Sequence, residues 1–280
     1  MPETMTPDAP EQTQPQSNGD VLIFDHVNLS FEDNHLLQDI SFHVEPGETR
    51  IILGPAGCGK SVLLKLADGL MCPDSGSIRV FGEEITTMPE VEQFKLRSRI
   101  GMVFQESALF DSMTVADNVA YRMMQDENTK EDEARNRVLE VLRFVELEGA
   151  IDKFPSELSG GMRRRVAIAR AVISKPELIL YDSPTGGLDP ITSNTIIELL
   201  VKQRDVSHAT SLVVTHRMQD AFTLATHEYD QEKHQMRRIA DNGIEAKTKF
   251  LVIHDGHVVF DGDTRELVKC DDPWLKDYLS

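Results

Sequence analysis

The chain has 280 residues, of which 40% are hydrophobic, enough for one large folded domain or a domain with a subdomain. Its formal net charge of −18 argues against a sequence-independent grip on nucleic acid, which needs clustered lysines and arginines. The three cysteines are odd in number and lack metal-ligand spacing, so neither a disulfide framework nor a zinc site is expected.

The first part of the chain, residues 1–19, is rich in proline, glutamine, threonine and acidic residues. This composition predicts a disordered tail, with a docking arm as the alternative. The segment has neither the basic nor the apolar region of a signal peptide, and no later apolar run approaches the roughly 18 residues that span a bilayer. Together with the cysteine pattern, this favours a cytoplasmic protein.

A strand, a glycine-rich loop and a helix follow the tail. Residues 21–31 and 37–48 alternate in the manner of strands joined by turns, and residues 49–54 (TRIILG) form a short buried strand. Residues 60–70 have the apolar spacing of a helix. Two further strands are expected within 75–85 and 97–105.

The second half of the chain alternates helices and strands. Residues 106–175 are predicted to form a helical subdomain, which includes an amphipathic helix within 130–147. Strand patterns return in LILYD, SLVVTH and FLVIHDGHVVFDG. This order predicts an α/β fold with a mostly parallel sheet covered by helices, whose ligands bind at the carboxyl ends of the strands. Residues 226–249 are strongly polar and are interpreted as a solvated insertion, and 271–280 as a C-terminal extension.

The motif GPAGCGKS, from Gly54 to Ser61, fits G-x-x-x-x-G-K-[ST] and lies between the expected strand and helix. Glycines allow backbone N–H groups to turn inward around phosphates, Lys60 reaches the β and γ phosphates, and Ser61 ligates Mg²⁺. The alternative is an ordinary glycine-rich turn. Cys58 occupies a variable position and is interpreted as filler rather than as a redox switch.

A second element of the site is Asp182, which ends an apolar strand and can complete the metal site. A third motif is the sequence LSGGM at 158–162, which RRRVAIARAV follows directly. With these motifs in this order, the chain resembles the nucleotide-binding subunit of ABC transporters over about residues 20–270. The resemblance implies ATP and Mg²⁺ as cofactors.

The resemblance also assigns roles to single residues. Phe31 falls where that family stacks an aromatic ring on adenine, and Gln105 matches the glutamine that touches Mg²⁺ and the attacking water. Asp189 matches a dimer-contact loop, and His216 the histidine that contacts the γ phosphate. Three of them also have a simpler reading: Phe31 as a core phenylalanine, Gln105 as a surface glutamine and His216 as a histidine at a strand end.

The family arrangement further implies a head-to-tail homodimer, in which the signature of one chain faces the γ phosphate held by the other. A helix start offers free N–H donors and a favourable dipole to such an anion. The predicted metal ligands are Ser61, Gln105 and Asp182. The predicted nucleotide-binding residues are Phe31, Gly54, Pro55, Ala56, Gly57, Cys58, Gly59, Lys60, Ser61, Val62, Ser159, Gly160, Gly161 and Asp189.

Met162 stands where the usual signature has glutamine, and LSGGM followed by arginines is similar to the Mla and Mce-associated phospholipid transport ATPases. The segments FQESALFDSMTVADNVAY and DDPWLKDYL are also similar to theirs. This implies a lipid substrate, an integral-membrane permease with a lipid-binding Mce-type component, and a place on the cytoplasmic face of the inner membrane. The arginines 163–165 are interpreted as a solvated helix face with partial contacts, with a specific lipid or phosphate role as the alternative. Leu109, Phe110 and Met113 line either a permease groove or the subdomain core.

The residue after Asp182 is Ser183, where the family pattern has a glutamate that polarises water. An unassisted hydroxyl is not a general base near neutral pH, so Ser183 cannot activate water as a glutamate would. The predicted catalytic set is Lys60, Gln105, His216 and Ser183. Three alternatives remain open: an active ATPase in which His216 or a partner acid positions water, a slow ATPase, and a regulator without turnover. An ABC ATPase acting on ribosomes or DNA is disfavoured because neither paired domains nor a basic patch is visible.

Overall fold

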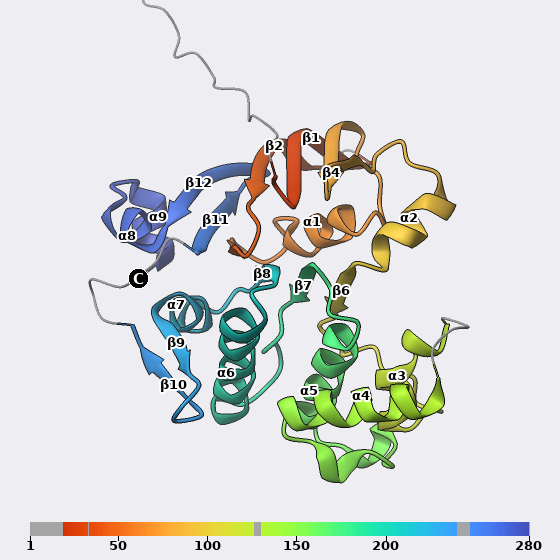
Figure 1. Cartoon of the computed structure of the whole chain (residues 1–280). Coiled ribbons are helices and arrows are strands. Elements are labelled where there is room, and N and C mark those ends of the chain that lie inside the picture. Colours follow the sequence, from red (N-terminus) through yellow and green to blue (C-terminus); the bar gives the residue numbers. More distant parts are fainter. Residues whose placement is uncertain (1–18, 33, 126–129, 240–246, 280) are drawn as a thin grey trace, which may run out of the picture.

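The computed structural model describes residues 19–32, 34–125, 130–239 and 247–279 (Figure 1). The expected tail therefore lies outside the described residues except for Gly19, and so does the part of the polar insertion from 240 to 246. Three sheets and the helices between them make up the described chain.

The central sheet has six strands in the order β12-β11-β3-β8-β7-β6. All neighbouring pairs are parallel except β11 and β12. The loops that follow the parallel strands therefore emerge at one edge, where the sequence places its motifs. The strands are β3 (Thr49–Leu53), β6 (Ile100–Val103), β7 (Leu178–Asp182), β8 (Thr210–Val214), β11 (Thr248–His254) and β12 (His257–Asp263).

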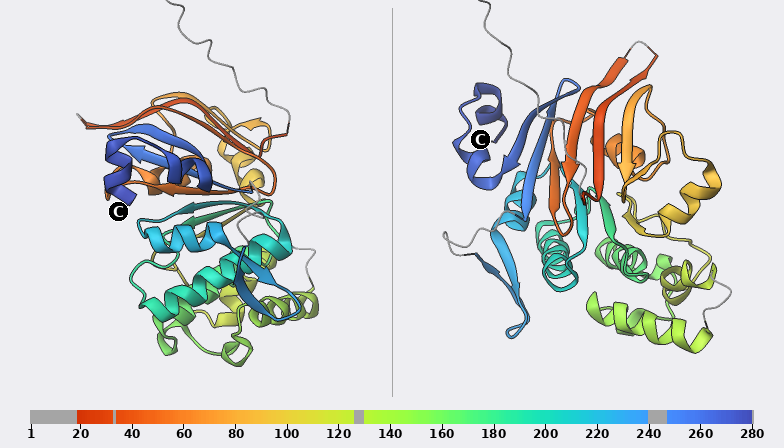
Figure 2. Two further views of the ribbon diagram at one scale, coloured as in Figure 1. Left: turned by 90° about the vertical axis from the view of Figure 1, so that its left-hand side faces the viewer. Right: turned by 45° about the horizontal axis from the view of Figure 1, so that its top comes forward.

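An antiparallel sheet of order β2-β1-β4-β5 covers one face of the central sheet, and Figure 2 shows the two layers. Helix α1 (Lys60–Ala67) packs between them with its leucines buried. The strands of the second sheet are β1 (Leu22–Phe31), β2 (Asn34–Val44), β4 (Ser75–Val80) and β5 (Glu83–Glu84), and α2 (Glu90–Arg97) follows them. The two early strands predicted from alternation are confirmed.

Side chains alternate across the central sheet and divide the interior into two cores. In β3, Ile52 packs with α1 and the antiparallel sheet, while Ile51 and Leu53 pack with the helices on the other face. Because both faces are buried, the strand is apolar throughout rather than alternating. The apolar run TRIILG thus reports a strand covered on both sides.

Helices cover the second face of the sheet, and the segment from 115 to 172 extends away from it at one end of the molecule (Figure 1). The helix α4 (Glu131–Phe144) buries Val138 and Leu142, as its amphipathic pattern predicts. The remaining helices are α3 (Val115–Ala120), η1 (Met123–Gln125), η2 (Glu148–Ala150), η3 (Pro155–Glu157), α5 (Gly160–Val172), α6 (Pro190–Ser207), α7 (Met218–Thr226), α8 (Thr264–Lys269) and α9 (Pro273–Leu279).

The polar stretch 226–249 contains a hairpin that the sequence analysis did not anticipate. Strand β9 (His227–Asp230) pairs with β10 (Gln235–Arg238), and the hairpin lies against α6. The backbone amides of Tyr229 and Met236 donate to Asp205 Oδ2 (2.8 Å) and Glu198 Oε1 (3.2 Å) on that helix. The strands are polar because β10 is largely solvent-exposed, so their periodicity carries no apolar signal.

Candidate functional site

The phosphate loop joins β3 to α1 in a conformation that requires glycine. Gly54 has φ 150°, and a Cβ there would lie 2.3 Å from the carbonyl oxygen of Ile253. Gly59 has φ 96° and is the N-cap of α1. These glycines let the chain turn tightly into the helix, so that the free N–H groups of the first turn of α1 face the loop.

Lys60, the first residue of α1, folds back over this loop. Its Nζ donates to the carbonyl oxygens of Gly54 (2.8 Å) and Pro55 (2.6 Å) and lies 3.7 Å from Cys58 Sγ. The side chain is buried, which holds the ammonium beside the helix N-terminus. A fixed cation next to unpaired N–H donors is the arrangement that binds the phosphates of a nucleotide.

Ser61 and Asp182 meet at the edge of the sheet although they are far apart in sequence. The Ser61 hydroxyl donates to Asp182 Oδ1 at 2.8 Å, and Asp182 is buried at the end of β7. A hydroxyl and a carboxylate are hard oxygen donors of the kind that Mg²⁺ takes from proteins, with phosphates and water completing its shell. These two oxygen donors therefore fit Mg²⁺. Among the described residues, no group of three or more His, Cys, Asp or Glu side chains is placed to hold a metal ion.

Ser183 follows directly and is held in a rare backbone conformation. Its φ is 44°, its side chain is buried, and its backbone N–H donates to the Val214 carbonyl at 2.9 Å. The Ser183 carbonyl in turn accepts from Gly186 N–H. A left-handed conformation of a non-glycine residue costs about 1–3 kcal/mol and persists where surrounding contacts impose it. The position after Asp182 is thus fixed by backbone hydrogen bonds to neighbouring loops, and it carries a hydroxyl instead of a carboxylate.

Gln105 and His216 lie on the loops that flank Ser183. The Cγ of Gln105 and the Cβ of Ser183 lie 3.6 Å and 3.4 Å from the point that a Cβ on Gly186 would occupy, so the two side chains are neighbours. His216 follows β8, whose last residue accepts the Ser183 amide. Both Gln105 and His216 are exposed. The structure therefore brings Gln105 and the loop of His216 to the two sides of Ser183.

The signature residues 159–161 lie at the start of α5, beside the start of α6. Ser159 caps α5 by accepting from Met162 N–H at 3.3 Å, and a Cβ on Gly161 would lie 2.3 Å from Thr192 Cγ2. Asp189 caps the neighbouring helix α6 and accepts from the Thr192 hydroxyl and backbone, which lowers the pKa of its carboxyl group. Ser159 and Asp189 are exposed. The signature thus presents a capped helix start beside the Asp189 turn, whereas Ser61 and Asp182 mark the phosphate side.

Phe31, the expected adenine-stacking residue, ends β1 and is 46% exposed. This exposure contradicts the alternative reading of a core phenylalanine. The next strand, β2, carries Leu37, whose Cδ2 lies 2.8 Å from the position of a Cβ on Gly59. The antiparallel ribbon that ends in Phe31 therefore touches the phosphate loop.

The interpretation of residues 163–165 as a solvated helix face is wrong for Arg164. That side chain is 4% exposed and donates to the Phe104 and Gly186 carbonyl oxygens. Arg163 donates to the Leu158 carbonyl at 2.6 Å and remains exposed. A buried arginine inside a run of three gives no sequence signal, because its burial is decided by loops distant in sequence.

A second residue that the sequence analysis did not assign is Tyr278, in the C-terminal helix α9. Its hydroxyl accepts a hydrogen bond of 2.9 Å from the backbone N–H of Gly54. Its ring stacks on Trp274, which stacks on His254 at the end of β11. The C-terminal segment thus supports the start of the phosphate loop, and only the resemblance of DDPWLKDYL to a family motif pointed toward it.

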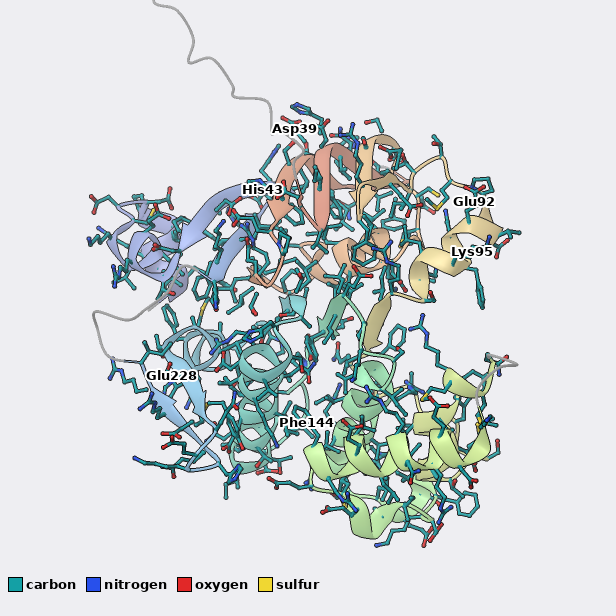
Figure 3. All side chains as sticks on the ribbon, in the orientation of Figure 1. Asp39, His43, Glu92, Lys95, Phe144 and Glu228 are labelled. Atoms are coloured by element: carbon teal, nitrogen blue, oxygen red, sulfur yellow. The ribbon has the colours of Figure 1, made fainter. Side chains whose placement is uncertain are left out.

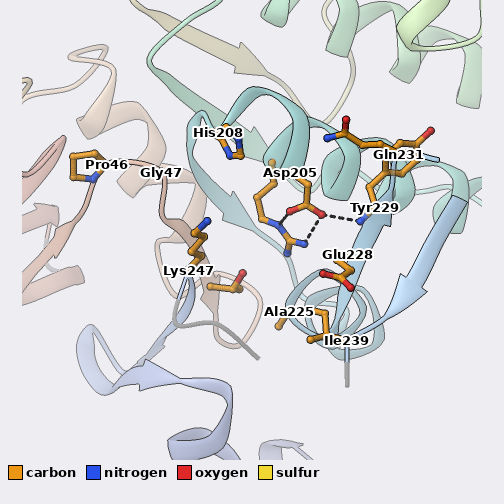
Figure 4. Close-up of a pocket in the computed structure, with 12 residues that line it drawn as sticks. Pro46, Gly47, Asp205, His208, Ala225, Glu228, Tyr229, Gln231, Ile239 and Lys247 are labelled. Carbon is orange, nitrogen blue, oxygen red and sulfur yellow. Dashed lines mark hydrogen bonds and ion pairs between the residues drawn. The ribbon is translucent and has the colours of Figure 1, made fainter. Parts of the chain in front are cut away.

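A cavity of about 640 Å³ lies near the amino-terminal ends of the strands, away from these motifs (Figure 4). It is lined by Gly47 before β3, by Thr248 at the start of β11 and by the hairpin β9–β10. The Arg204 guanidinium at this cavity is paired with Asp205 and also donates to the Leu224 and His227 carbonyls. The charge of Arg204 is thus compensated inside the fold, so this guanidinium at the cavity has a structural role.

Comparison with known proteins decides the family. The family described as ABC transporter matches residues 37–186, which include the phosphate loop, the signature and Asp182. The chain belongs to the ABC transporter family. Its resemblance to the ATP-binding subunits of such transporters is confirmed, and ATP with Mg²⁺ is the cofactor pair of the domain.

Individual ABC relatives differ in what their names say they transport. A "probable ribonucleotide transport ATP-binding protein mkl" from Mycobacterium leprae is 34% identical, covering 91% of this chain and 67% of the relative. The "intermembrane phospholipid transport system ATP-binding protein MlaF" from Haemophilus influenzae is 38% identical, covering 72% of this chain and 77% of the relative. This chain spans about two thirds of the length of the mycobacterial relatives that it matches.

Among solved structures, a dimeric ABC cassette, MJ0796, in a post-hydrolysis state with ADP and Pi is similar. It has a TM-score of 0.73 and 28% identity, and the match covers 86% of this chain and 98% of that one. The fold expected from the sequence is thereby confirmed as that of an ABC ATP-binding domain. None of the helices in the described part of the chain has the length and apolar character needed to cross a bilayer.

Proposed function

We propose that this chain is the ATP-hydrolysing subunit of a membrane transporter that moves phospholipids or related lipids, and that it works as a homodimer at the cytoplasmic face of the inner membrane. The observation that carries the nucleotide part is the assembled pair Ser61 and Asp182 beside Lys60. The lipid part rests on the MlaF relative and on the LSGGM signature. The domain comprises residues 20–270, with a helical subdomain at 106–175 and a C-terminal extension from 271.

In this proposal the chain's own residues divide binding from hydrolysis. Lys60 and the loop amides bind the phosphates, Phe31 stacks on the base, and Ser61, Asp182 and Gln105 would hold Mg²⁺. The ion supplies charge neutralisation on the phosphate oxygens during phosphoryl transfer. Gln105 and His216, on the two sides of Ser183, orient the attacking water. Phosphoryl transfer depends mainly on positioning and charge, so it tolerates a hydroxyl at 183 at a reduced rate.

The homodimer follows from the separation of the signature from the phosphate loop. Ser159, Gly160 and Gly161 start a helix that is exposed at its N-terminus and lies beside Asp189. A second chain placed head to tail would bring this helix start to the γ phosphate, where free N–H donors and the helix dipole favour an anion. Binding of ATP would then close the dimer, and hydrolysis would reopen it.

A surface for the permease is formed by exposed apolar side chains on α2 and around α3. Val91 and Phe94 are 75% and 71% exposed on α2, and Figure 3 shows Glu92 and Lys95 projecting from the same helix. Phe110 is also exposed and packs against Tyr121 in a tilted arrangement, with ring centroids 4.7 Å apart. Large apolar side chains exposed in this way mark contact sites for other proteins.

The 110–114 loop of this surface is fixed from within. Asn118 is fully buried, accepts from Phe110 N–H at 2.8 Å, and donates to the Phe110, Met113 and Thr114 carbonyls. Leu109 instead packs partly against the core. Leu109 therefore packs with the subdomain core, whereas Phe110 is exposed and can line the proposed permease groove.

The substrate class is tested by isolating the chain with its membrane partners from native membranes. We expect an integral-membrane permease and a lipid-binding Mce-type protein in the complex, with ATP turnover that rises in phospholipid vesicles. A permease that co-purifies with a binding protein for polar solutes, and whose turnover ignores lipid, would contradict the lipid assignment while leaving the ATPase intact.

The second candidate is a nucleotide-binding regulator without turnover, which Ser183 favours. His216→Ala separates the two. If His216 helps to position water, single-turnover hydrolysis in the complex should fall about 10²-fold, the scale of a lost positioning group, with ATP affinity retained. A wild-type complex that binds ATP and releases no phosphate over many minutes would instead establish the regulator.

A further inference from the structure

Arg164 joins three parts of the nucleotide site that are separate in sequence. It extends from the first turns of α5, just after the signature residues, and its side chain is 4% exposed. One Nη donates to the carbonyl of Phe104 at 2.7 Å and the other to the carbonyl of Gly186 at 3.3 Å. A planar guanidinium with fixed donor directions suits such a bridge, because it holds two acceptors at once.

The first acceptor belongs to the turn that carries Gln105. Phe104 directly precedes Gln105, and its carbonyl also accepts from Ser107 N–H, which closes the turn. Ser107 and Ala108 then have φ values of 64° and 46°, a conformation that non-glycine residues avoid. A turn with two such residues does not hold itself, so contacts from outside must keep it in place.

A second arginine of the same helix supports this turn from its other end. Arg170 donates to the carbonyls of Ser107 (2.9 Å) and Ala108 (2.7 Å). Burial lowers the pKa values of both arginines. A guanidinium nevertheless stays protonated in proteins, so each side chain is a cation. The 104–108 segment is therefore held by α5 at both ends.

The second acceptor of Arg164 belongs to the turn that carries Ser183. Gly186 N–H donates to the Ser183 carbonyl, and the Gly186 carbonyl accepts from Arg164. Ser183 itself has φ 44°. The charges of Glu106 and Asp182 act on the guanidinium and favour its charged form. Arg164 thus touches the ends of both turns that bear the residues proposed to face the water.

We propose that Arg164 is a positioning residue for ATP hydrolysis, which fixes Gln105 relative to Ser183 and couples both to the signature helix α5. The inference rests on the proposed ATPase function and deepens it. Arg164 does not touch nucleotide; it acts by setting where Gln105 stands. Because α5 also begins at the signature, a shift of this helix when the dimer closes would be carried to the two water-side turns by one side chain.

The test uses the full chain in complex with its membrane partner. Arg164→Met keeps a long, unbranched side chain, replaces the guanidinium by an apolar thioether and removes both donors. A displacement of about 1 Å in a catalytic group costs on the order of 10²-fold in rate. We therefore expect the single-turnover rate constant to fall about 10- to 100-fold, with the Kd for a fluorescent ATP analogue changed less than about threefold.

Arg137→Met is the matched control. Arg137 lies on α4 and donates at 3.1 Å to the carbonyl of Ile173, the C-cap of α5, so it is another arginine-to-carbonyl contact that involves this helix. Its loss should leave the rate constant within about twofold of wild type, since no water-side turn is involved. An equal fall in both variants would mean that helix stability, not positioning, sets the rate, and would overturn the inference.

A double-mutant cycle with Gln105→Ala gives the sharpest readout. If Arg164 acts through Gln105, adding Arg164→Met to Gln105→Ala should lower the rate by less than about twofold further, because residues that act as a unit are not additive. Multiplicative losses would overturn the proposal. Arg164→Lys, which can reach one carbonyl and keeps the charge, should give an intermediate rate, and it serves as the test if Arg164→Met does not fold.

Failure of the proposed function would look different. A wild-type complex without turnover contradicts the ATPase assignment and removes the basis of this inference with it. A wild-type complex with turnover and an Arg164→Met rate equal to it contradicts the positioning role alone.

Discussion

The phosphate loop after β3 and the loop after β7 meet at one contact, between Ser61 and Asp182, but they are built differently. The first uses glycines wherever φ is positive at Gly54, Gly57 and Gly59. The second places Ser183 in the left-handed region and relies on hydrogen bonds from neighbouring loops to keep it there. The first loop therefore adopts its positive φ values without strain, while the second depends on the packing around it.

In the proposed mechanism, this difference separates nucleotide binding from hydrolysis. The binding loop carries its own cation and donors, and it does not depend on residue 183. The proposed hydrolysis side is assembled from three chain segments, so we expect changes in its geometry to leave nucleotide affinity intact. Substitutions in the two loops and at their supports test whether binding and hydrolysis are separate.

The largest effect is expected for Lys60→Ala. The lost ammonium leaves the phosphates without their fixed cation, so ATP affinity should fall at least about 100-fold in a titration with a fluorescent analogue. Lys65→Ala is the control, because Lys65 is an exposed residue of the same helix. Retained affinity in Lys60→Ala would contradict the assignment of the phosphate loop.

Ser183→Glu changes the second loop. A carboxylate at this position can polarise water, so single-turnover hydrolysis in the complex should rise by about tenfold while ATP affinity stays within a few-fold. Ser183→Gln has the same shape without the charge and should not raise the rate. An unchanged rate in Ser183→Glu would show that Ser183 does not limit turnover.

A pH effect is expected on the helix that starts at the phosphate loop. Burial raises the pKa of Asp68, at the end of α1, to about 6, against the opposing charges of Arg97 and Arg122. The folded state thus binds this proton more tightly than the unfolded chain, whose aspartate titrates near about 4. Stability should fall as pH rises from about 4 to about 6, and the loss is complete above the folded pKa.

Asp68→Asn removes this loss. At pH 8 the variant should be more stable than wild type by about 1–3 kcal/mol in urea unfolding, and the gain should disappear near pH 4. ATP affinity should not change at either pH, because the effect lies at the far end of α1. A gain of the same size at both pH values would rule out titration of Asp68 as its cause.

The smallest effect is expected for Tyr278→Phe. Only the hydroxyl that accepts from Gly54 N–H is removed, while the stack on Trp274 remains. The free energy of unfolding should fall by about 1 kcal/mol, and ATP affinity by less than about fivefold. Hydrolysis at saturating ATP should stay the same; a large loss there would mean that the C-terminal helix also controls the second loop.

Much of the site could be predicted because its parts are local. A phosphate loop needs glycines and a lysine within eight residues, and Asp182 ends a strand that is apolar along its whole length. Arg164 and Tyr278 escaped prediction because their partners lie far away in the chain: Arg164 contacts a residue 60 positions earlier, and Tyr278 one 224 positions earlier. Neither contact leaves a periodicity in the sequence.

The hairpin β9–β10 shows the same limit in another form. Its strands are polar on a solvated face, so hydrophobic alternation could not reveal them, and their pairing is stabilised by α6. Similarly, Phe110 and Leu109 are adjacent and equally apolar, yet one is exposed and the other partly buried. Burial of single residues is decided by what packs over them.

Sequence alone was enough for the fold class, the family, the cation and glycines of the binding loop, and the substitution at 183. Each of these depends on residues that lie close together or on a fixed order of short motifs. Only the tertiary structure decided that Arg164 is buried, that Gln105 and Ser183 are neighbours, and that the C-terminal helix supports the phosphate loop. These contacts join loops at one edge of a parallel sheet, and that edge exists only once strands distant in sequence have paired.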